Sequence, residues 1–282
     1  MPCNLLLLLI AVALAPAASL AQPDGEPANG EPEGDDITIE ALQALKYDRC
    51  QDALNILLDE ERRADTLSRI HRRLKAEAFT CLGSYENALA IYSGLLKEEA
   101  NNRQYLYRRA RLYGILGQWK KAYRDCARLH RLNPGDSAHC KRCGEYALGA
   151  EKYREAAAFL SCRLSANAQD MEAQYLLALA HQGQKNFSQA LLLINGCLAA
   201  NPAEGKYYAA RARMYEQTEA LRLAAPDYQT YLTKNPADHQ TWLQYAHLLR
   251  RLGRAAEACR AFEQSEHYGN LDAGRYLYRY CK

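Results

Sequence analysis

Small side chains recur along the chain at a fixed spacing of 34 residues. One series consists of Ala76, Ala110, Gly144, Ala178, Ala212 and Ala246, and a second follows twelve residues later at Ala88, Ala122, Ala156, Ala190, Ala224 and Ala258. Bulky side chains follow the second series by four residues, at Tyr92, Cys126, Leu160, Ile194, Tyr228 and Phe262. A period of this length predicts a repeat protein in which each unit is one supersecondary element.

The recurring positions resemble the tetratricopeptide repeat, which has a small residue at repeat position 8, alanine at 20, a bulky residue at 24 and proline at 32. Three prolines, Pro134, Pro202 and Pro236, fall at the proline position. The resemblance implies two helices per unit, which approach closely because both present a small side chain, as at Ala76 and Ala88. It implies an all-α, right-handed solenoid of about seven helix-turn-helix repeats, at 34–68, 69–102, 103–136, 137–170, 171–204, 205–238 and 239–272, with a capping helix at 273–282.

Some positions depart from this pattern. Gly83, Gly117 and Gly253 mark turns between the two helices of their units, but the other units have no glycine there. Pro226 lies inside the second helix of the sixth unit, where we expect it to kink or delay that helix because it removes a backbone hydrogen bond. The first unit matches least well and is open to a second interpretation, a helical hairpin of another kind.

The N-terminal segment has the pattern of a signal peptide. Residues 5–15 form an apolar run of 11, whereas a membrane-spanning helix needs about 20 residues. Small residues at Ser19 and Ala21 suit signal peptidase, so we expect residues 1–21 to be removed; an uncleaved anchor is the alternative. The sequence thus predicts an extracytoplasmic protein, periplasmic or secreted, with no membrane insertion after cleavage.

Charge is divided unevenly between the next segment and the rest. Residues 22–36 contain three prolines, three glycines and no large apolar residue, which predicts a flexible acidic linker before a solenoid at 37–282. All 36 basic residues lie beyond position 40, and from 69 to 146 there are 16 basic against seven acidic residues. The second and third repeats are therefore expected to be basic.

The resemblance also implies where a partner binds, because the first helices of such repeats line a concave groove that holds segments of other proteins. The residues expected at this groove are Arg73, Tyr107, Arg108, Arg111 and Lys141. Arginine forks suit carboxylates, and tyrosine offers rigid contact area. The sequence therefore predicts an acidic protein or peptide partner; an ordinary solvated helix face is the alternative.

The known chaperone-binding variant of this fold clamps a terminal carboxylate with lysine and asparagine on its first two units. Arg73 and Glu77 stand where lysine and asparagine are expected, and Arg108 replaces the next asparagine. A cytosolic chaperone adaptor is therefore disfavoured. A polyanion binder for nucleic acid or glycan, on the same basic face, remains the alternative function, with nucleic acid the less favoured ligand.

Nine cysteines remain after removal of the signal peptide, and in an oxidising compartment they can pair. In the repeat frame, residues on neighbouring antiparallel helices lie at the same height when their repeat positions sum to a constant, which the contact between positions 8 and 20 puts near 28. Four pairs have sums of 30 or 31, namely Cys50 with Cys81, Cys126 with Cys143, Cys140 with Cys162, and Cys259 with Cys281. Cys197 is left over. Other connectivities stay open, as does the interpretation that these cysteines are buried apolar residues.

The chain lacks the motifs of the common enzyme classes. Cys140 and Cys143 form a C-x-x-C, but a redox motif needs a βαβ context, and a zinc site needs more ligands than His139 adds. No phosphate-binding loop, nucleophile elbow or zinc-protease motif occurs. We therefore expect no catalytic residue, cofactor or metal, and a protein-interaction scaffold rather than an enzyme. Asn186 begins a glycosylation sequon in a predicted turn.

Overall fold

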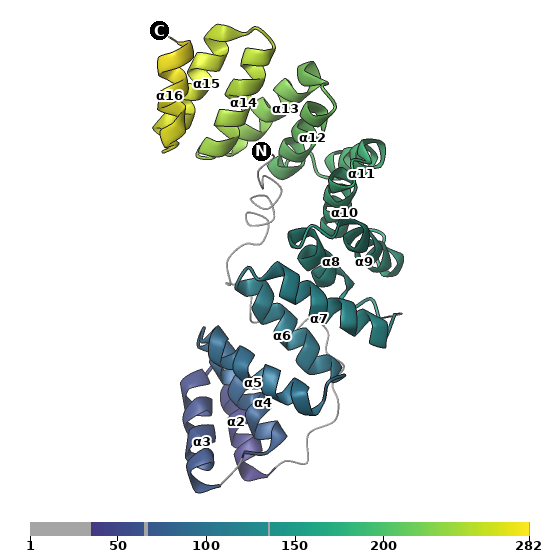
Figure 1. The fold of residues 1–282 in the computed structure, drawn as a ribbon, viewed down its shortest axis with the longest axis vertical. Coiled ribbons are helices and arrows are strands. Elements are labelled where there is room, and N and C mark those ends of the chain that lie inside the picture. Colours follow the sequence, from purple (N-terminus) through teal and green to yellow (C-terminus); the bar gives the residue numbers. More distant parts are fainter. Residues whose placement is uncertain (1–34, 65–66, 135, 282) are drawn as a thin grey trace. The chain divides into compact units, whose positions relative to one another are not determined.

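The computed structural model describes residues 35–64, 67–134 and 136–281, and these residues form fifteen helices and no strand (Figure 1). They divide into two compact units, one ending at Ala166 and the other beginning at Asn167. The predicted signal peptide and most of the predicted linker lie outside the described residues. The expected all-α repeat fold is confirmed for the part that the structure describes.

In each unit, consecutive helices pack as hairpins joined by short turns (Figure 1). The first unit contains α2 (Asp36–Lys46), α3 (Cys50–Arg63), α4 (Arg69–Cys81), α5 (Tyr85–Glu98), α6 (Arg103–Ile115), α7 (Trp119–Leu132), α8 (Cys140–Gly149) and α9 (Tyr153–Ala166). The second unit contains α10 (Met171–Gly183), α11 (Phe187–Ala200), α12 (Gly205–Gln217), α13 (Leu221–Lys234), α14 (His239–Arg251), α15 (Ala255–His267) and α16 (Leu271–Tyr280).

Short polar side chains begin the first helix of several pairs. The side chains of Ser68, Asn102 and Asp238 each accept a hydrogen bond from a backbone N–H three residues further on. Such caps satisfy donors that have no partner inside the helix. Asp35 does the same for α2, which is why this helix begins at Asp36 and takes up the last residue of the predicted linker.

The turn inside each hairpin requires one residue in the left-handed region. Gly83, Gly117 and Gly253 have φ of 73°, 66° and 75°. The equivalent positions of the other hairpins hold residues with side chains, and their φ is also positive: Asp48, Glu151, Lys185 and Glu219. The turn geometry is therefore the same in all of these hairpins, although only three of them have the glycine that favours it.

The small residues of the two series lie where the helices of a pair meet. Every alanine of both series is essentially inaccessible to solvent, including Ala76 and Ala88. A Cβ added at Gly144 would lie 2.6 Å from Cγ of Leu160, so even alanine is too large there. The 34-residue period in the sequence therefore records close helix contacts.

Proline is not what ends the second helices. Those followed by Pro134, Pro202 and Pro236 end two residues earlier, and α5 and α9 end at equivalent positions without proline. The expectation for Pro226 was wrong in one respect, because α13 is not delayed: it spans Leu221–Lys234, in the same register as α7. Pro226 lies in the second turn, where it removes a single hydrogen bond.

The third and sixth repeats each contain an ion pair at the same repeat positions, and its carboxylate is buried. Nε and Nη2 of Arg109 donate to the two carboxylate oxygens of Asp125, over 2.7 and 2.8 Å, and the same atoms of Arg211 bind Asp227 over 2.7 and 2.8 Å. Each pair joins the first helix of its repeat to the second. Bidentate pairing of this kind fixes the relative orientation of the two helices as well as their separation.

The ends of the array are also built from hairpins. In the first repeat, Ala41 and Ala53 are fully buried, and the buried His71 of α4 lies 3.1 Å from Thr38 and 3.2 Å from Asp35. Hydrogen bonds from Thr38 and His71 lower the pKa of Asp35 to about 2. At the other end, α16 packs on α15, begins at Leu271, and covers the last hydrophobic cluster.

Candidate functional site

Three of the charged groups expected or noted at the groove form one cluster on α4 and α6. Arg73 donates to Glu77 over 2.7 Å, and the guanidinium of Arg108 lies 3.5 Å from the same carboxylate. The Arg73 and Glu77 side chains are 20% and 15% exposed. Glu77 therefore neutralises part of the positive charge that the sequence places on this face.

Arg111 differs from the other two arginines. Its guanidinium lies 5.9 Å from the centre of the Tyr107 ring, and it makes no ion pair within the described residues. Tyr107 is itself buried and stacks on His139 with 3.9 Å between ring centres. The Tyr107 ring thus packs between Arg111 and His139, and because it is buried it offers a partner little of the contact area that was expected of it.

A pocket lies beside this cluster in the first unit. Its volume is about 280 Å³, including its open mouth, and it is lined by Thr80, Tyr92, Arg108, Arg111, Leu112 and Ile115. These residues come from the end of α4, the middle of α5 and the middle and end of α6. Two of the five residues predicted for partner binding, Arg108 and Arg111, therefore share one pocket.

Tyr92 brings an unpaired polar group to this pocket. Its side chain is 1% exposed, and its hydroxyl has no hydrogen-bond partner within the described residues. Burial, and then the negative charge of Glu77, raise the pKa of Tyr92, so the hydroxyl remains a neutral donor. In the sequence, Tyr92 was noted as a bulky residue of the repeat pattern, and its contribution to the pocket was missed, since only first helices were considered as groove.

Lys141 is not brought to the other four residues by any contact. It lies in the first turn of α8, is partly exposed, and makes no hydrogen bond or ion pair in the part of the chain that the structure describes. The five predicted residues therefore separate into an Arg73–Arg108 cluster around Glu77, an Arg111–Tyr107 contact, and a lone Lys141.

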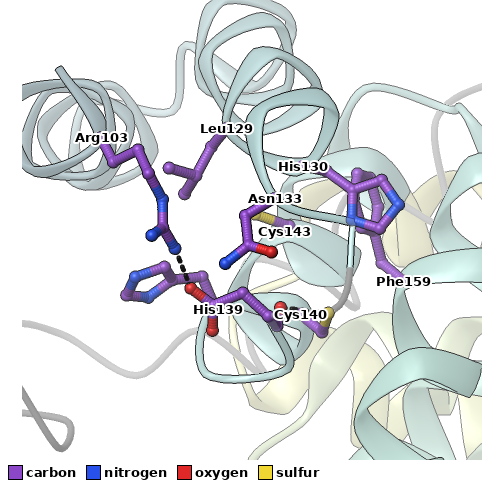
Figure 2. A pocket seen from close by; sticks show the side chains of 9 residues that line it. Arg103, Leu129, His130, Asn133, His139, Cys140, Cys143 and Phe159 are labelled. Carbon is purple, nitrogen blue, oxygen red and sulfur yellow. Dashed lines mark hydrogen bonds and ion pairs between the residues drawn. The ribbon is translucent and has the colours of Figure 1, made fainter. Parts of the chain in front are cut away.

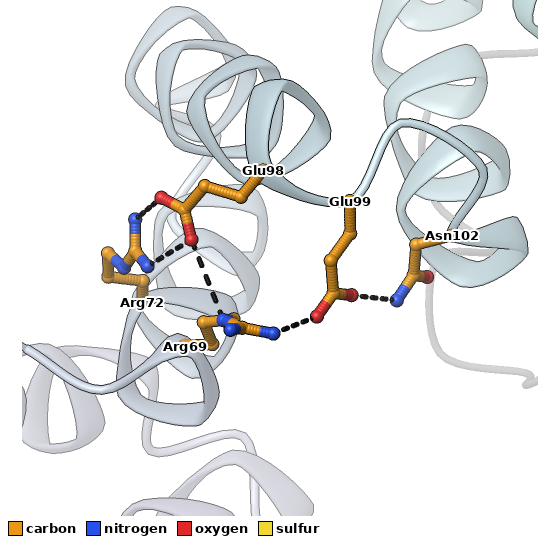
Figure 3. A network of polar contacts seen from close by, with 5 residues as sticks. All are labelled: Arg69, Arg72, Glu98, Glu99 and Asn102. Atoms are coloured by element: carbon orange, nitrogen blue, oxygen red, sulfur yellow. Dashed lines mark hydrogen bonds and ion pairs between the residues drawn. The ribbon is translucent and has the colours of Figure 1, made fainter.

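Other basic residues of the second repeat are occupied by acidic neighbours. Figure 3 shows Arg72 binding both oxygens of Glu98, over 2.7 and 2.9 Å, and Arg69 reaching both Glu98 and Glu99. Glu99 also accepts a hydrogen bond of 2.8 Å from Asn102. This network joins α4 to the end of α5 and removes two arginines from the charge available to a partner.

A second pocket of about 240 Å³ lies around α8 (Figure 2). It is lined by Arg103, Leu129, His130, Asn133, Asp136, His139, Cys140, Cys143 and Phe159. Arg103 pairs with Asp136, and the His130 ring meets Phe159 edge-on at 5.2 Å. Among the described lining residues, the one acidic side chain is thus paired with the one arginine, and both cysteines belong to the pairs described below.

The structure places the four expected cysteine pairs at disulfide distance. The Cα–Cα distances are 6.0 Å for Cys50 and Cys81, 5.5 Å for Cys126 and Cys143, 6.2 Å for Cys140 and Cys162, and 5.6 Å for Cys259 and Cys281. These lie within the range that a disulfide spans. Cys197 is buried and unpaired, and burial raises the pKa of its thiol to about 11.

One group of residues has the spacing of metal ligands but not the chemistry. Asp48, Cys50 and Cys81 place three potential ligand atoms within 4.8 Å of one another. Two of those atoms are the sulfurs that pair with each other, and a paired sulfur is not the thiolate that binds metal. Among the described residues, no helix is both long enough and apolar enough to cross a membrane.

Helix hairpins repeated every 34 residues, a left-handed residue in each turn and small residues at each helix contact define the tetratricopeptide-repeat fold, which the chain has. A crystal structure of a tetratricopeptide repeat protein from Parabacteroides merdae superimposes with a TM-score of 0.62 at 19% identity, covering 86% of this chain and 95% of that one. MamA 41-end from Desulfovibrio magneticus RS-1 gives 0.53 at 22% identity, covering 60% and 96%. No protein-family model and no curated protein matches the sequence.

Proposed function

We propose that the protein is an extracytoplasmic, non-catalytic interaction scaffold whose first unit binds an acidic protein or peptide. The observation that carries this proposal is the pocket on α4, α5 and α6, where Arg108 and Arg111 lie beside an unpaired tyrosine hydroxyl. An acidic ligand supplies the negative charge and the acceptor that this pocket lacks. Arg111 has no acidic partner of its own within the described residues, so it is the principal contact.

The proposed location rests on two independent features. Four cysteine pairs at disulfide distance are typical of proteins in an oxidising compartment. The apolar run at residues 5–15 is typical of a signal-peptide core. Together they support a periplasmic or secreted scaffold.

Polyanion binding is less well supported than peptide binding. A polyanion is held by many unpaired cations along its backbone, whereas Arg69, Arg72 and Arg73 are bound to carboxylates of the same chain. The pocket is a single concave site rather than an extended basic track. It therefore suits one acidic group of a folded or extended protein segment.

A charge-reversal experiment tests the proposal. The double variant Arg111→Glu/Lys141→Glu removes two cations that have no acidic partner in the described chain, so it should not disturb folding. Binding of a fluorescein-labelled, glutamate-rich dodecapeptide, followed by fluorescence anisotropy, should weaken at least tenfold. The matched control Lys120→Glu/Arg124→Glu reverses two exposed charges on α7 that also lack an acidic partner among the described residues, and it should bind like wild type.

Two outcomes contradict the proposal. Equal loss of binding in the test and control variants indicates that only overall charge matters. Tight binding of heparin, with a steep salt dependence and no preference for the peptide, indicates the polyanion alternative.

A further inference from the structure

In the sixth repeat, a buried tyrosine hydroxyl donates to a carboxylate of the same repeat, whereas the hydroxyl of Tyr92 in the second repeat has no such acceptor among the described residues. Tyr228 occupies the same repeat position as Tyr92, is also completely buried, and its hydroxyl donates to Glu216 over 2.9 Å. The other oxygen of Glu216 lies 3.5 Å from Arg251. A carboxylate thus fits between the buried tyrosine hydroxyl at repeat position 24 and an arginine of the following repeat.

The second repeat has the tyrosine but not the carboxylate. Thr80 stands in the repeat position of Glu216, and its short side chain donates to the carbonyl of Ala76 over 2.7 Å instead of reaching Tyr92. The space left beside Thr80 is part of the pocket. Position 24 of the first, third, fourth, fifth and seventh repeats carries no hydroxyl, so among the described residues only the second repeat combines a buried hydroxyl at this position with a missing acceptor.

The following repeat supplies the cation here as well. Arg108 and Arg111 of α6 line the pocket, as Arg251 of α14 faces Glu216. The carboxylate of Glu77 is already engaged by two arginines, Arg73 over 2.7 Å and Arg108 at 3.5 Å. Among the described residues, the pocket therefore presents the hydroxyl of Tyr92 and the guanidinium of Arg111, neither of which is bound by a carboxylate.

We infer that this pocket is a carboxylate subsite, in which an acidic group of the partner takes the position that Glu216 occupies in the sixth repeat. The partner carboxylate accepts a hydrogen bond from Tyr92 and pairs with Arg111. Leu112 and Ile115 contact the methylene stem that carries it. This inference rests on the proposed function, because it names the chemistry recognised at the same surface.

Two substitutions test the subsite more finely than charge reversal. Tyr92→Phe keeps the ring and removes only the hydroxyl, so affinity for an acetylated, C-terminally amidated glutamate-rich dodecapeptide should fall about fivefold. Removal of an unpaired buried hydroxyl should leave the melting temperature unchanged or raise it. Thr80→Glu places the chain's own carboxylate in the subsite, so binding should weaken more than tenfold, whereas the uncharged control Thr80→Gln should bind within threefold of wild type.

The probes separate the two sources of carboxylate. Binding of the amidated glutamate peptide shows that side-chain carboxylates are recognised. The second probe is a glutamine-rich peptide with a free C-terminus. If wild type binds this peptide and Thr80→Glu does not, a terminal carboxylate is recognised instead. Both results support the subsite if Thr80→Glu abolishes them.

The inference is overturned if Tyr92→Phe and Thr80→Glu bind both probes as wild type does while Arg111→Glu/Lys141→Glu fails, because the groove then binds an acidic partner elsewhere. If no variant alters binding, the proposed function fails as well. Should Thr80→Glu fold poorly, Tyr92→Phe decides alone.

Discussion

At the scale of single residues, the hairpin turns carry strain that has no signal in the sequence. A left-handed backbone costs an L-residue about 1 kcal/mol, which glycine avoids. Gly83, Gly117 and Gly253 were predicted as turn residues, and the structure places each of them there with positive φ. Glu151, Lys185 and Glu219 were not predicted as turn residues. Their left-handed conformation is imposed by the packing of the flanking helices and not by their side chains.

Replacement of Lys185 by glycine should therefore stabilise the second unit. Its φ is 62°, and the exposed side chain makes no contact that would be lost within the described residues. We expect Lys185→Gly to raise the free energy of unfolding by about 0.5–1 kcal/mol in urea denaturation. Gln229→Gly, at an exposed position in the interior of α13, should lower it by about 0.5–1 kcal/mol, and a similar loss for Lys185→Gly would refute the argument.

At the scale of elements, the Arg69–Arg72–Glu98–Glu99 network fastens α4 to α5. A hydrogen bond from Arg72 lowers the pKa of Glu98 below its ordinary 4.5, and hydrogen bonds from Asn102 and Arg69 do the same to the pKa of Glu99. Since the folded-state pKa values are depressed, the stabilisation is complete above about pH 4.5 and is lost as the pH falls through the lower, folded-state values.

Glu98→Gln tests this dependence. The variant should unfold at lower urea than wild type at pH 7, and the difference should shrink as the pH falls below about 4, because the wild-type carboxylate is then protonated as well. Glu263→Gln, which removes an exposed carboxylate without an ion pair in the described residues, is the matched control and should shift the midpoint little. A Glu98→Gln deficit that persists undiminished at pH 2.5 would contradict the assignment.

The candidate site was predictable only in part. The resemblance to the tetratricopeptide repeat placed Arg108 and Arg111 at the groove, and the structure brings both to one pocket. The same reasoning could not foresee that Glu77 would bind Arg73, because a single sequence does not show which rotamers meet. Tyr92 was noted only as a bulky residue of the repeat pattern, and nothing in its repeat position alone indicates a missing acceptor.

At the scale of the whole molecule, the cysteine pairs are distributed unequally. Three pairs belong to the first unit, whereas the single pair of the second unit joins only α15 to the C-terminal end of the chain at Cys281. Closing loops of this size contributes about 3 kcal/mol per disulfide. Reduction should therefore destabilise the first unit far more than the second.

The two tryptophans allow this to be measured, because Trp119 belongs to the first unit and Trp242 to the second. Trp242→Phe leaves the first unit as the only tryptophan reporter, and Trp119→Phe leaves the second. With a phosphine reductant, the urea midpoint reported by Trp119 should fall by about 2 M or more, and that reported by Trp242 by less. No shift in either variant would show that the pairs are not formed in the protein as made, and equal falls in both would contradict the unequal effect on the two units.

The two cysteine pairs that share α8 interleave along the chain, since Cys140 lies between Cys126 and Cys143, while Cys143 lies between Cys140 and Cys162. The two disulfide-closed loops therefore overlap along the sequence, and neither loop lies entirely within the other. If the two ends of the chain are pulled apart, tension passes from Cys126 to Cys143, back to Cys140 and on to Cys162. The two disulfides therefore shorten the fully extended length of residues 126–162 by about 100 Å. An unfoldase or a narrow pore would thus meet a doubled-back loop in place of a single strand.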